Sequence, residues 1–281
     1  MKLSIIIVNY NVTKLLRKCL SSIDYYIQNI EFEVIVIDNN SPDSSWRDLK
    51  TDFPQVRLMA SEENLGFACA NNKAIKEAKG EYVLLLNPDT ELEADDIIDI
   101  LDFADSKENL GALGVRMHDA NGSFLPESKR SVPNMLNSFE KLFINFKKNT
   151  SKSYYRNDIG EFDIAEVEVI TGAFLLIKKK LYEESGGLDE KYFMYGEDID
   201  LCFTLLQKKY KNWYYGKSAI IHHKGKSTVK DLKYLDRFDG AMQIFIDKYY
   251  KKQKPIHYRF LSAGLKLRHT LEKSKIKKRF K

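Results

Sequence analysis

The chain has 281 residues and a mass of 32.7 kDa, with 43% hydrophobic and 30% charged residues. That length allows one large domain or two modest ones with a sizeable core, and the composition excludes disorder, a collagen-like repeat and a coiled coil as the main architecture. The longest apolar runs, at 5–8, 83–86 and 173–177, are far shorter than the roughly 18 to 20 residues of a spanning helix. We therefore predict no transmembrane segment.

The beginning of the chain and its cysteines indicate a protein of the cytosol. The first residues lack the length and the cleavage site of a secretory signal. The cysteines, Cys19, Cys69 and Cys202, are widely separated and odd in number, so they fit neither a disulfide framework nor a CxxC metal site. We expect reduced thiols.

Charge is distributed unevenly along the chain, whose net charge is +5. Residues 248–281 hold 13 Lys and Arg against one acid, whereas residues 1–247 hold 32 basic and 39 acidic residues. An acidic body therefore carries a basic tail.

The first hundred residues alternate short apolar runs with amphipathic segments, which is typical of a mostly parallel sheet covered by helices. The continuous Ile/Val run at 3–8 fits a strand that is buried on both faces. We predict strands at 3–8, 33–38, 56–60 and 82–86, and helices at 12–24, 42–50, 66–79 and 94–105.

The second part of the chain is less regular. A strand at 113–117 is followed by an irregular insertion over 118–163, with a short helix near 136–146. Regular structure is expected again at 166–170, 173–177 and 179–185, in a helix that begins near Glu197, and in a strand at 217–223. The remaining residues read as helices. The chain is therefore of the α/β class, with a helical basic tail.

Polar segments follow several predicted strands or open a helix, at 9–11, 38–41, 87–90 and 197–200. Open parallel sheets bind ligands at the carboxyl ends of their strands, so we expect these segments at one edge. Asp38 is placed to accept hydrogen bonds from a base or a ribose, although an ordinary Asx turn explains the same residues. Asp89 is placed to bind a divalent cation on phosphate oxygens, and a proline turn is the alternative.

A carboxylate at the start of the 197–200 segment is a candidate general base. Glu197, Asp198 and Asp200 share the first helical turn, where the helix dipole stabilises acids without any further role. His222 or His223 could complete a metal site with Asp89. Lys224, Lys226 and Ser227 follow closely and could reach phosphate oxygens. P-loop and dinucleotide-binding glycine motifs are absent from the sequence.

Seven segments, taken in order, resemble those of the inverting family 2 glycosyltransferases, and among these the rhamnosyltransferase-like enzymes that build bacterial surface polysaccharides. They are IIIVNYN at 5–11, VIDNNS at 36–41, NLGFACANN at 64–72, LLNPDT at 85–90, TGAFLLI at 171–177, GGLDEKYFMYGEDIDLC at 186–202 and HHKGKST at 222–228. The resemblance covers about residues 3–228. It implies the GT-A fold, a nucleotide-sugar donor and a divalent cation, Mg²⁺ or Mn²⁺.

The resemblance also implies a domain plan. Residues 1–228 would form the GT-A catalytic domain, with a nucleotide-binding half over about 1–100 and an acceptor half over about 101–228 that contains the insertion 118–163. Residues 229–281 would form a helical basic extension.

Site roles carry over from matching motif positions. Asp198 matches the catalytic base, Glu197 its acceptor-orienting neighbour, Asp89 the second aspartate of the DxD metal motif and His222 the late metal ligand. Asp38 would bind the nucleotide base, with Tyr10 and Asn64 beside it. The predicted donor-binding residues are Asn9, Tyr10, Asn11, Asp38, Asn40, Asn64, Gly66, Asn87 and Asp89.

One position departs from the family pattern. Asn87 stands where the DxD motif has its first aspartate. An amide oxygen is an uncharged and weaker ligand than a carboxylate, so we expect low metal affinity, and a metal-independent reaction stays open.

These observations predict an inverting glycosyltransferase of polysaccharide biosynthesis. Its donor would be a nucleoside-diphosphate sugar, with rhamnose as the first expectation and a galactose- or glucose-type sugar next, and its acceptor a saccharide or a lipid-linked saccharide. A nucleotidyltransferase is one alternative, although a Gly-rich basic loop is expected after its first strand. A non-enzymatic nucleic-acid-binding protein is another, suggested by aromatic residues such as Tyr249 and Tyr258 in the basic tail.

The tail is interpreted here as a membrane-binding segment. Leucine and phenylalanine side chains can form an apolar side on its basic helix; they are Phe260, Leu261, Leu265, Leu267 and Leu271. We therefore expect no nucleic-acid partner, and a peripheral position at the inner face of the cell membrane, close to a lipid-linked acceptor.

Overall fold

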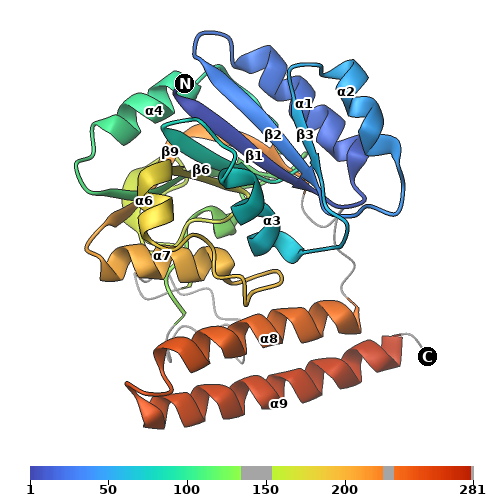
Figure 1. Ribbon diagram of the computed structural model, residues 1–281. Helices are drawn as coiled ribbons and strands as arrows, with labels where there is room; N and C mark the ends of the chain where they lie inside the picture. The colour runs from blue at the N-terminus through green and yellow to red at the C-terminus, as the bar shows by residue number, and fades with distance from the viewer. Residues whose placement is uncertain (134–153, 224–230, 280–281) are drawn as a thin grey trace.

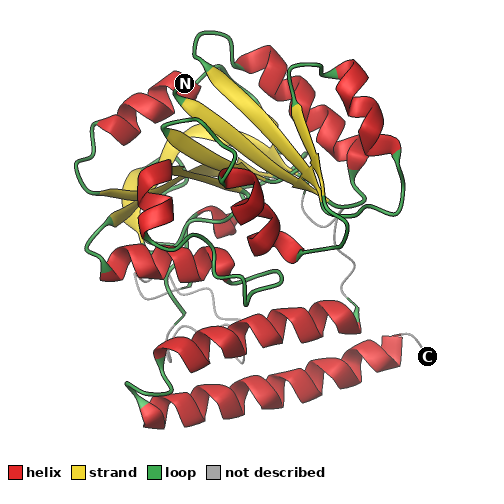
Figure 2. Ribbon diagram, in the orientation of Figure 1, coloured by secondary structure: helices red, strands yellow, loops and turns green. Residues whose placement is uncertain are grey.

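A mixed β-sheet lies at the centre of the molecule, with helices on both of its faces (Figures 1 and 2). The computed structural model describes residues 1–133, 154–223 and 231–279. Within these residues nine strands form one sheet: eight follow the order β3-β2-β1-β4-β8-β6-β9-β5, and the ninth, β7, pairs with β9. The strands are β1 (Leu3–Asn9), β2 (Phe32–Asp38), β3 (Arg57–Ala60), β4 (Tyr82–Leu86), β5 (Thr90–Leu92), β6 (Leu110–His118), β7 (Ile164–Val167), β8 (Phe174–Lys178) and β9 (Lys211–His222).

The sheet is parallel in its N-terminal part and mixed beyond it. β1 pairs in parallel with β2 and β4, and β2 pairs in parallel with β3. β8 runs antiparallel to both β4 and β6, and β9 runs parallel to β6. The carboxyl ends of β1, β2, β4 and β9 therefore meet at one edge, together with the first residues of β8. This edge carries the polar segments that the sequence singled out.

Two apolar cores cover the two faces of the sheet. In β1, Leu3, Ile5 and Ile7 belong to the core beneath α1 and α4, whereas Ile6 and Val8 belong to the core beneath α3 and α7. This double burial explains the unbroken apolar run of the first strand. The helices are α1 (Thr13–Tyr26), α2 (Leu49–Asp52), α3 (Gly66–Ile75), α4 (Ile97–Asp105), α6 (Lys179–Glu184) and α7 (Glu197–Gln207), with short 3₁₀ helices at Ser45–Asp48 and Pro126–Ser128.

The C-terminal part is helical, as predicted, and its helices α8 (Leu232–Tyr249) and α9 (Pro255–Arg279) form a hairpin (Figure 1). α8 packs on α7. The ring of Phe203 in α7 lies 5.7 Å from that of Phe245 in α8, and the hydroxyl of Thr204 in α7 lies 3.2 Å from that of Tyr249 in α8. α9 lies antiparallel beside α8. Among the described residues, no helix has the length and apolar content needed to cross a membrane.

Some element boundaries differ from the prediction. β5 was not expected, α3 ends at Ile75, and β9 begins six residues earlier than predicted, at Lys211. The start of β9 includes Asn212, a polar residue that is completely buried. Its side chain accepts the backbone N–H of Ala112 at 2.9 Å and donates to the carbonyl of Glu168 at 2.8 Å. The short helix expected near 136–146 lies outside the described residues.

Candidate active site

A cavity of about 540 Å³ lies at the edge of the sheet where the carboxyl ends meet. The structure brings seven of the predicted site residues together in its lining: Tyr10, Asn64, Asn87, Asp89, Glu197, Asp198 and His222. Five others, Asn9, Asn11, Asp38, Asn40 and Gly66, lie outside the lining. The segments that contribute are far apart in the chain, so the fold itself creates the site.

The first turn of α7 places the acidic residues at this cavity. Tyr195 and Gly196 precede the helix with φ of +71° and +86°. A Cβ atom at position 196 would lie 3.2 Å from the ring of Tyr192 and 3.3 Å from Met242, so glycine suits both the backbone and the space. The sharp turn brings Asp198 to the cavity wall, in the helical turn where a negative charge is favoured.

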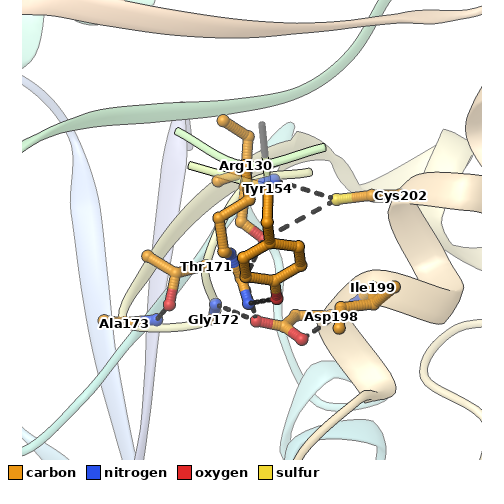
Figure 3. Close-up of polar contacts among 9 residues, drawn as sticks. Arg130, Tyr154, Thr171, Gly172, Ala173, Asp198, Ile199 and Cys202 are labelled. Atoms are coloured by element: carbon orange, nitrogen blue, oxygen red, sulfur yellow. Dashed lines mark hydrogen bonds and ion pairs between the residues drawn. The ribbon is translucent and has the colours of Figure 1, made fainter. Parts of the chain in front are cut away.

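Asp198 is held by a buried ion pair (Figure 3). Its Oδ2 atom lies 2.6 Å from Nη2 of Arg130 and accepts the backbone N–H of Gly172 at 3.2 Å. Its Oδ1 atom accepts the N–H of Ile199 at 2.7 Å. Arg130 also donates to the carbonyl of Ile170 at 3.2 Å. The carboxylate is therefore fixed in one orientation, and the residues Arg130 and Asp198 are each only 9% exposed.

Arg130 is a site residue that the sequence analysis missed. It lies in the segment predicted as an irregular insertion, which has no periodic pattern and no motif to mark it. Its backbone forms a two-way bridge with Val169, with N···O distances of 3.2 and 3.0 Å. This bridge fastens the insertion to the chain just before β8, and so places the guanidinium opposite α7.

Glu197 also lines the cavity and is 6% exposed. Burial raises the pKa of its carboxyl group, and the neighbouring charge of Asp198 raises it further. Its Oε2 atom has no hydrogen-bond partner among the described residues. A carboxyl group in this state keeps its proton to a higher pH than usual and can donate a hydrogen bond into the cavity.

Asp89 and His222 form the candidate cation site. Asp89 is 3% exposed, and its Oδ1 atom lies 3.3 Å from Nε2 of His222. Adjacent ligands of an octahedral Mg²⁺ ion lie about 3 Å apart, so both atoms fit one ion. The Nε2 atom of His223 instead lies 2.5 Å from Oε1 of Glu91. Of the two histidines that the sequence left as alternatives, His222 is therefore the one whose side chain lies against Asp89. No cluster of three or more His, Cys, Asp or Glu ligands occurs in the described ranges, so substrate phosphates and water would complete the shell.

The polar side of the cavity, where the sequence predicts donor binding, is built on Asn39. Its Nδ2 atom donates to Oδ1 of Asn64 at 3.0 Å and to the carbonyl of Gly66 at 3.1 Å, and its Oδ1 accepts the N–H of Leu65 at 2.9 Å. Gly66 has φ of +78°, and a Cβ there would lie 2.3 Å from the carbonyl oxygen of Phe193. Only glycine allows this close approach, which packs the start of α3 against the backbone of Phe193.

Asn39, which was not singled out, therefore lines the cavity in place of its neighbour Asn40. Asn40 is exposed and has φ of +63°, outside the lining. The segment 38–41 contributes to the cavity through one residue and supports it through the others.

Asp38 has a supporting position in the structure. It is 2% exposed, and its carboxylate accepts hydrogen bonds from Nδ2 of Asn9 at 2.7 Å and from the N–H and hydroxyl of Ser41 at 2.9 and 2.6 Å. Ser41 in turn accepts the N–H of Asn11 at 2.8 Å. These contacts fasten the loops after β1 and β2 to each other. Direct contact between Asp38 and a nucleotide base stays a prediction.

α8 and α9 complete the wall of the cavity, which the sequence did not indicate. Leu261 and Leu265, expected on a membrane-facing side, line the cavity instead. The lining residues contributed by the hairpin are Tyr234, Arg237, Phe238, Met242, Phe245, Ile246, Tyr250, Leu261, Leu265 and Arg268. The basic tail is therefore part of the site.

Comparison with known proteins identifies the family. Residues 4–184 match the profile of glycosyl transferase family 2, so the chain belongs to this family. An N-acetylglucosaminyl-diphospho-decaprenol L-rhamnosyltransferase of Mycobacterium tuberculosis is 29% identical over 242 residues, which cover 82% of this chain and 78% of that protein. Rhamnosyltransferase WbbL of Escherichia coli is 31% identical over 150 residues, 50% of this chain and 54% of that protein.

Solved structures share the fold. TarS of S. aureus matches with a TM-score of 0.58 and 17% identity over 96% of this chain and 72% of that one. Mannosyltransferase PcManGT of Pyrobaculum calidifontis, solved with GDP-Man and Mn²⁺, matches with a TM-score of 0.60 and 17% identity over 95% and 73%. The predictions of a GT-A-like fold and of a glycosyltransferase are confirmed, and the nucleotidyltransferase and the non-enzymatic alternatives are set aside.

Proposed function

We propose that this glycosyltransferase moves a sugar, rhamnose as the first expectation and a galactose- or glucose-type sugar next, from a nucleoside diphosphate to a lipid-linked saccharide in surface polysaccharide synthesis. The observation that carries the proposal is the meeting of Asp198, Asp89 and His222 in one cavity with the polar donor side. The M. tuberculosis relative supports the choice of donor sugar and acceptor class through its name.

Asp198 acts as the general base in this proposal. Its fixed carboxylate takes the proton of an acceptor hydroxyl, whose oxygen forms a bond to the anomeric carbon while the bond from that carbon to the nucleotide oxygen breaks. The nucleoside diphosphate leaves with the bonding electron pair, and attack from the opposite face inverts the anomeric configuration. Burial raises the pKa of Glu197 to about 8, so its carboxyl group is protonated near neutral pH. It donates a hydrogen bond that orients the acceptor.

Asp89 and His222 would hold a divalent cation, Mg²⁺ or Mn²⁺, with Asn87 beside them in the lining. Such an ion supplies charge neutralisation for the departing diphosphate. Tyr10 is 44% exposed at the cavity and offers a ring face for the nucleotide base, with Asn39 and Asn64 as polar partners.

A donor screen tests the proposal. Thermal unfolding with Mn²⁺ and dTDP-rhamnose, UDP-galactose, UDP-glucose, UDP-N-acetylglucosamine or UDP-galactofuranose should reveal one donor that raises the melting temperature most. The same donor should release free nucleoside diphosphate when a saccharide acceptor is added. Release of pyrophosphate, or stabilisation by none of these donors, would contradict the proposal.

Membrane binding through α9 is the second part of the proposal. Four apolar side chains, Ile256, Phe260, Leu267 and Leu271, are 70%, 68%, 53% and 51% exposed. Their spacing places them within about 60° on one helix face, here called the outer stripe. Exposed cations lie on both sides of it: Arg259, Lys266, Lys273 and Lys277 on one side and Lys275 on the other. An apolar stripe between cations suits an anionic lipid surface, where the protein would be peripheral.

Vesicle flotation tests this part. The full chain should float with vesicles that contain anionic phospholipid and less with neutral vesicles. A variant with Phe260→Ser and Leu267→Ser should lose most of this binding and keep its melting temperature, because both side chains are exposed. Equal flotation of both proteins would remove the outer stripe from the proposal.

A further inference from the structure

The hairpin presents an apolar surface to the active-site cavity. Six side chains of α8 and α9 form it, here called the α8–α9 wall: Phe238, Met242, Phe245, Ile246, Leu261 and Leu265. Phe245, Ile246 and Leu265 are buried, with exposures of 2%, 8% and 6%. None of the six carries a hydrogen-bonding group that could replace the water around a sugar hydroxyl. The α8–α9 wall therefore differs from the polar donor side, which holds Asn39, Asn64 and Asn87.

The α8–α9 wall lies next to the proposed base. α8 packs on α7, the helix whose first turn carries Asp198, and Met242 lies close to Gly196 at the start of that helix. Lys248 fastens the contact through bonds of 2.8 Å to Asp189 and to Asp200. A ligand on the α8–α9 wall would therefore lie beside the residue that activates the acceptor.

Two arginines border the α8–α9 wall. Arg268 pairs with Asp239 and lies 5.1 Å from the ring centroid of Phe238. Arg237 lies over the ring of Phe193 at 4.2 Å and forms no ion pair within the described part of the chain. An apolar surface with a cation at its border is complementary to a hydrocarbon chain that carries a phosphate.

α9 connects this surface to the exterior. Leu261 and Leu265 point to the cavity side, whereas the outer stripe is exposed on the other side of the same helix. Apolar residues on two faces of one helix indicate two apolar contacts, one in the cavity and one outside it. The cavity and the proposed membrane surface are thus separated at this point by the thickness of one helix, α9.

From these observations, and resting on the proposed function, we infer that the α8–α9 wall binds the hydrocarbon chain of the acceptor next to its diphosphate. The stretch of α8 from Phe238 to Ile246 is about 12 Å long, enough for roughly two or three isoprene units. The enzyme thus recognises the first units of the acceptor lipid as well as its sugar.

Direct binding tests the inference without relying on catalysis. Isothermal titration calorimetry of the full chain compares farnesyl diphosphate with inorganic diphosphate, which lacks the hydrocarbon. Farnesyl diphosphate should bind at least about tenfold more tightly, because several buried methylene groups contribute. Equal affinities would overturn the inference.

Substitutions locate the binding surface. Met242→Asn and Leu261→Ser, at two partly exposed positions of the α8–α9 wall, should each weaken farnesyl diphosphate binding several-fold and leave diphosphate binding unchanged. Tyr25→Ser, at an exposed position on α1 outside the hairpin, is the control and should bind both probes like the unaltered protein. Equal loss from L261S and Y25S, or no loss from either wall variant, would overturn the inference.

A kinetic comparison separates this inference from the proposed function. With the donor chosen by the thermal screen, the KM for a geranyl-diphosphate-linked sugar should be at least about tenfold below that for its methyl analogue, with a similar kcat. Transfer to both acceptors at the same KM would refute the lipid contact and leave the glycosyltransferase proposal standing. Failure of nucleoside diphosphate release with every donor would refute the proposed donor, while the calorimetric result would still decide on the α8–α9 wall.

Discussion

Replacing Asp198 by Asn tests both the proposed base and the buried ion pair that orients it. The substitution removes one charge from a pair whose members are each 9% exposed and 2.6 Å apart. Breaking a buried pair from one side typically costs about 3–5 kcal/mol, because the remaining charge of Arg130 loses its partner. An Asn side chain still accepts a hydrogen bond, so we expect the lower end, about 3 kcal/mol.

A loss of this size should lower the melting temperature by roughly 6–12 °C. Transfer should fall by at least about 10²- to 10⁴-fold, since the positioned base is removed. Unfolding in urea gives the free energy of unfolding, and nucleoside diphosphate release well below the melting temperature gives the turnover. Activity is thereby compared in folded protein only.

The double variant Arg130→Met with Asp198→Asn separates the two effects. Without the buried guanidinium, the unpaired charge is gone, so the double variant should be more stable than Asp198→Asn alone, with a coupling energy of about 1–3 kcal/mol. Its transfer should stay low. Near-normal turnover of Asp198→Asn would refute the base assignment, and an unchanged free energy of unfolding would refute the reasoning about the ion pair.

Two further predictions concern the neighbouring groups. The pKa of Glu197 is raised in the folded state. The stability that its protonated carboxyl group contributes to the fold is therefore fully present below the ordinary pKa of 4.5 and is lost as the pH rises through the pKa of the folded state. Glu197→Gln should therefore melt like the unaltered protein at acidic pH and at a higher temperature above neutral pH; a constant difference across pH would contradict the assignment. His222→Ala should raise the Mn²⁺ concentration for half-maximal nucleoside diphosphate release at least about tenfold, whereas His223→Ala should change it little. Equal effects of the two substitutions would argue against His222 as the ligand.

The sequence predicted those parts of the fold that have strong local patterns. β4 has the predicted bounds, Tyr82–Leu86, because a continuous apolar run is followed by a proline turn. β5 was missed because its three residues, Thr90–Leu92, are too few to show a period, and it exists only through its pairing with β9. The gathering of polar segments at one edge followed from the parallel order of β1, β2 and β4.

Residues that depend on tertiary packing were not predictable. Arg130 stands in a segment without periodicity, and only its bridge to Val169 brings it to Asp198. In the tail, apolar residues occur on two faces of α9, so sequence alone could not decide that Leu265 packs inward while Leu267 stays exposed. The cavity lining contributed by the hairpin was missed for the same reason.

The position of the hairpin has a consequence for how the enzyme is made. Asn64 emerges early from the ribosome, but Arg268, which lines the same cavity, is synthesised some 200 residues later. The contacts within the hairpin are local in sequence, so α8 and α9 can form as a unit and dock on α7 after the rest of the cavity has been synthesised. Until then a nascent chain exposes the apolar face of α7 that the hairpin covers, and its cavity lacks the wall that α8 and α9 contribute.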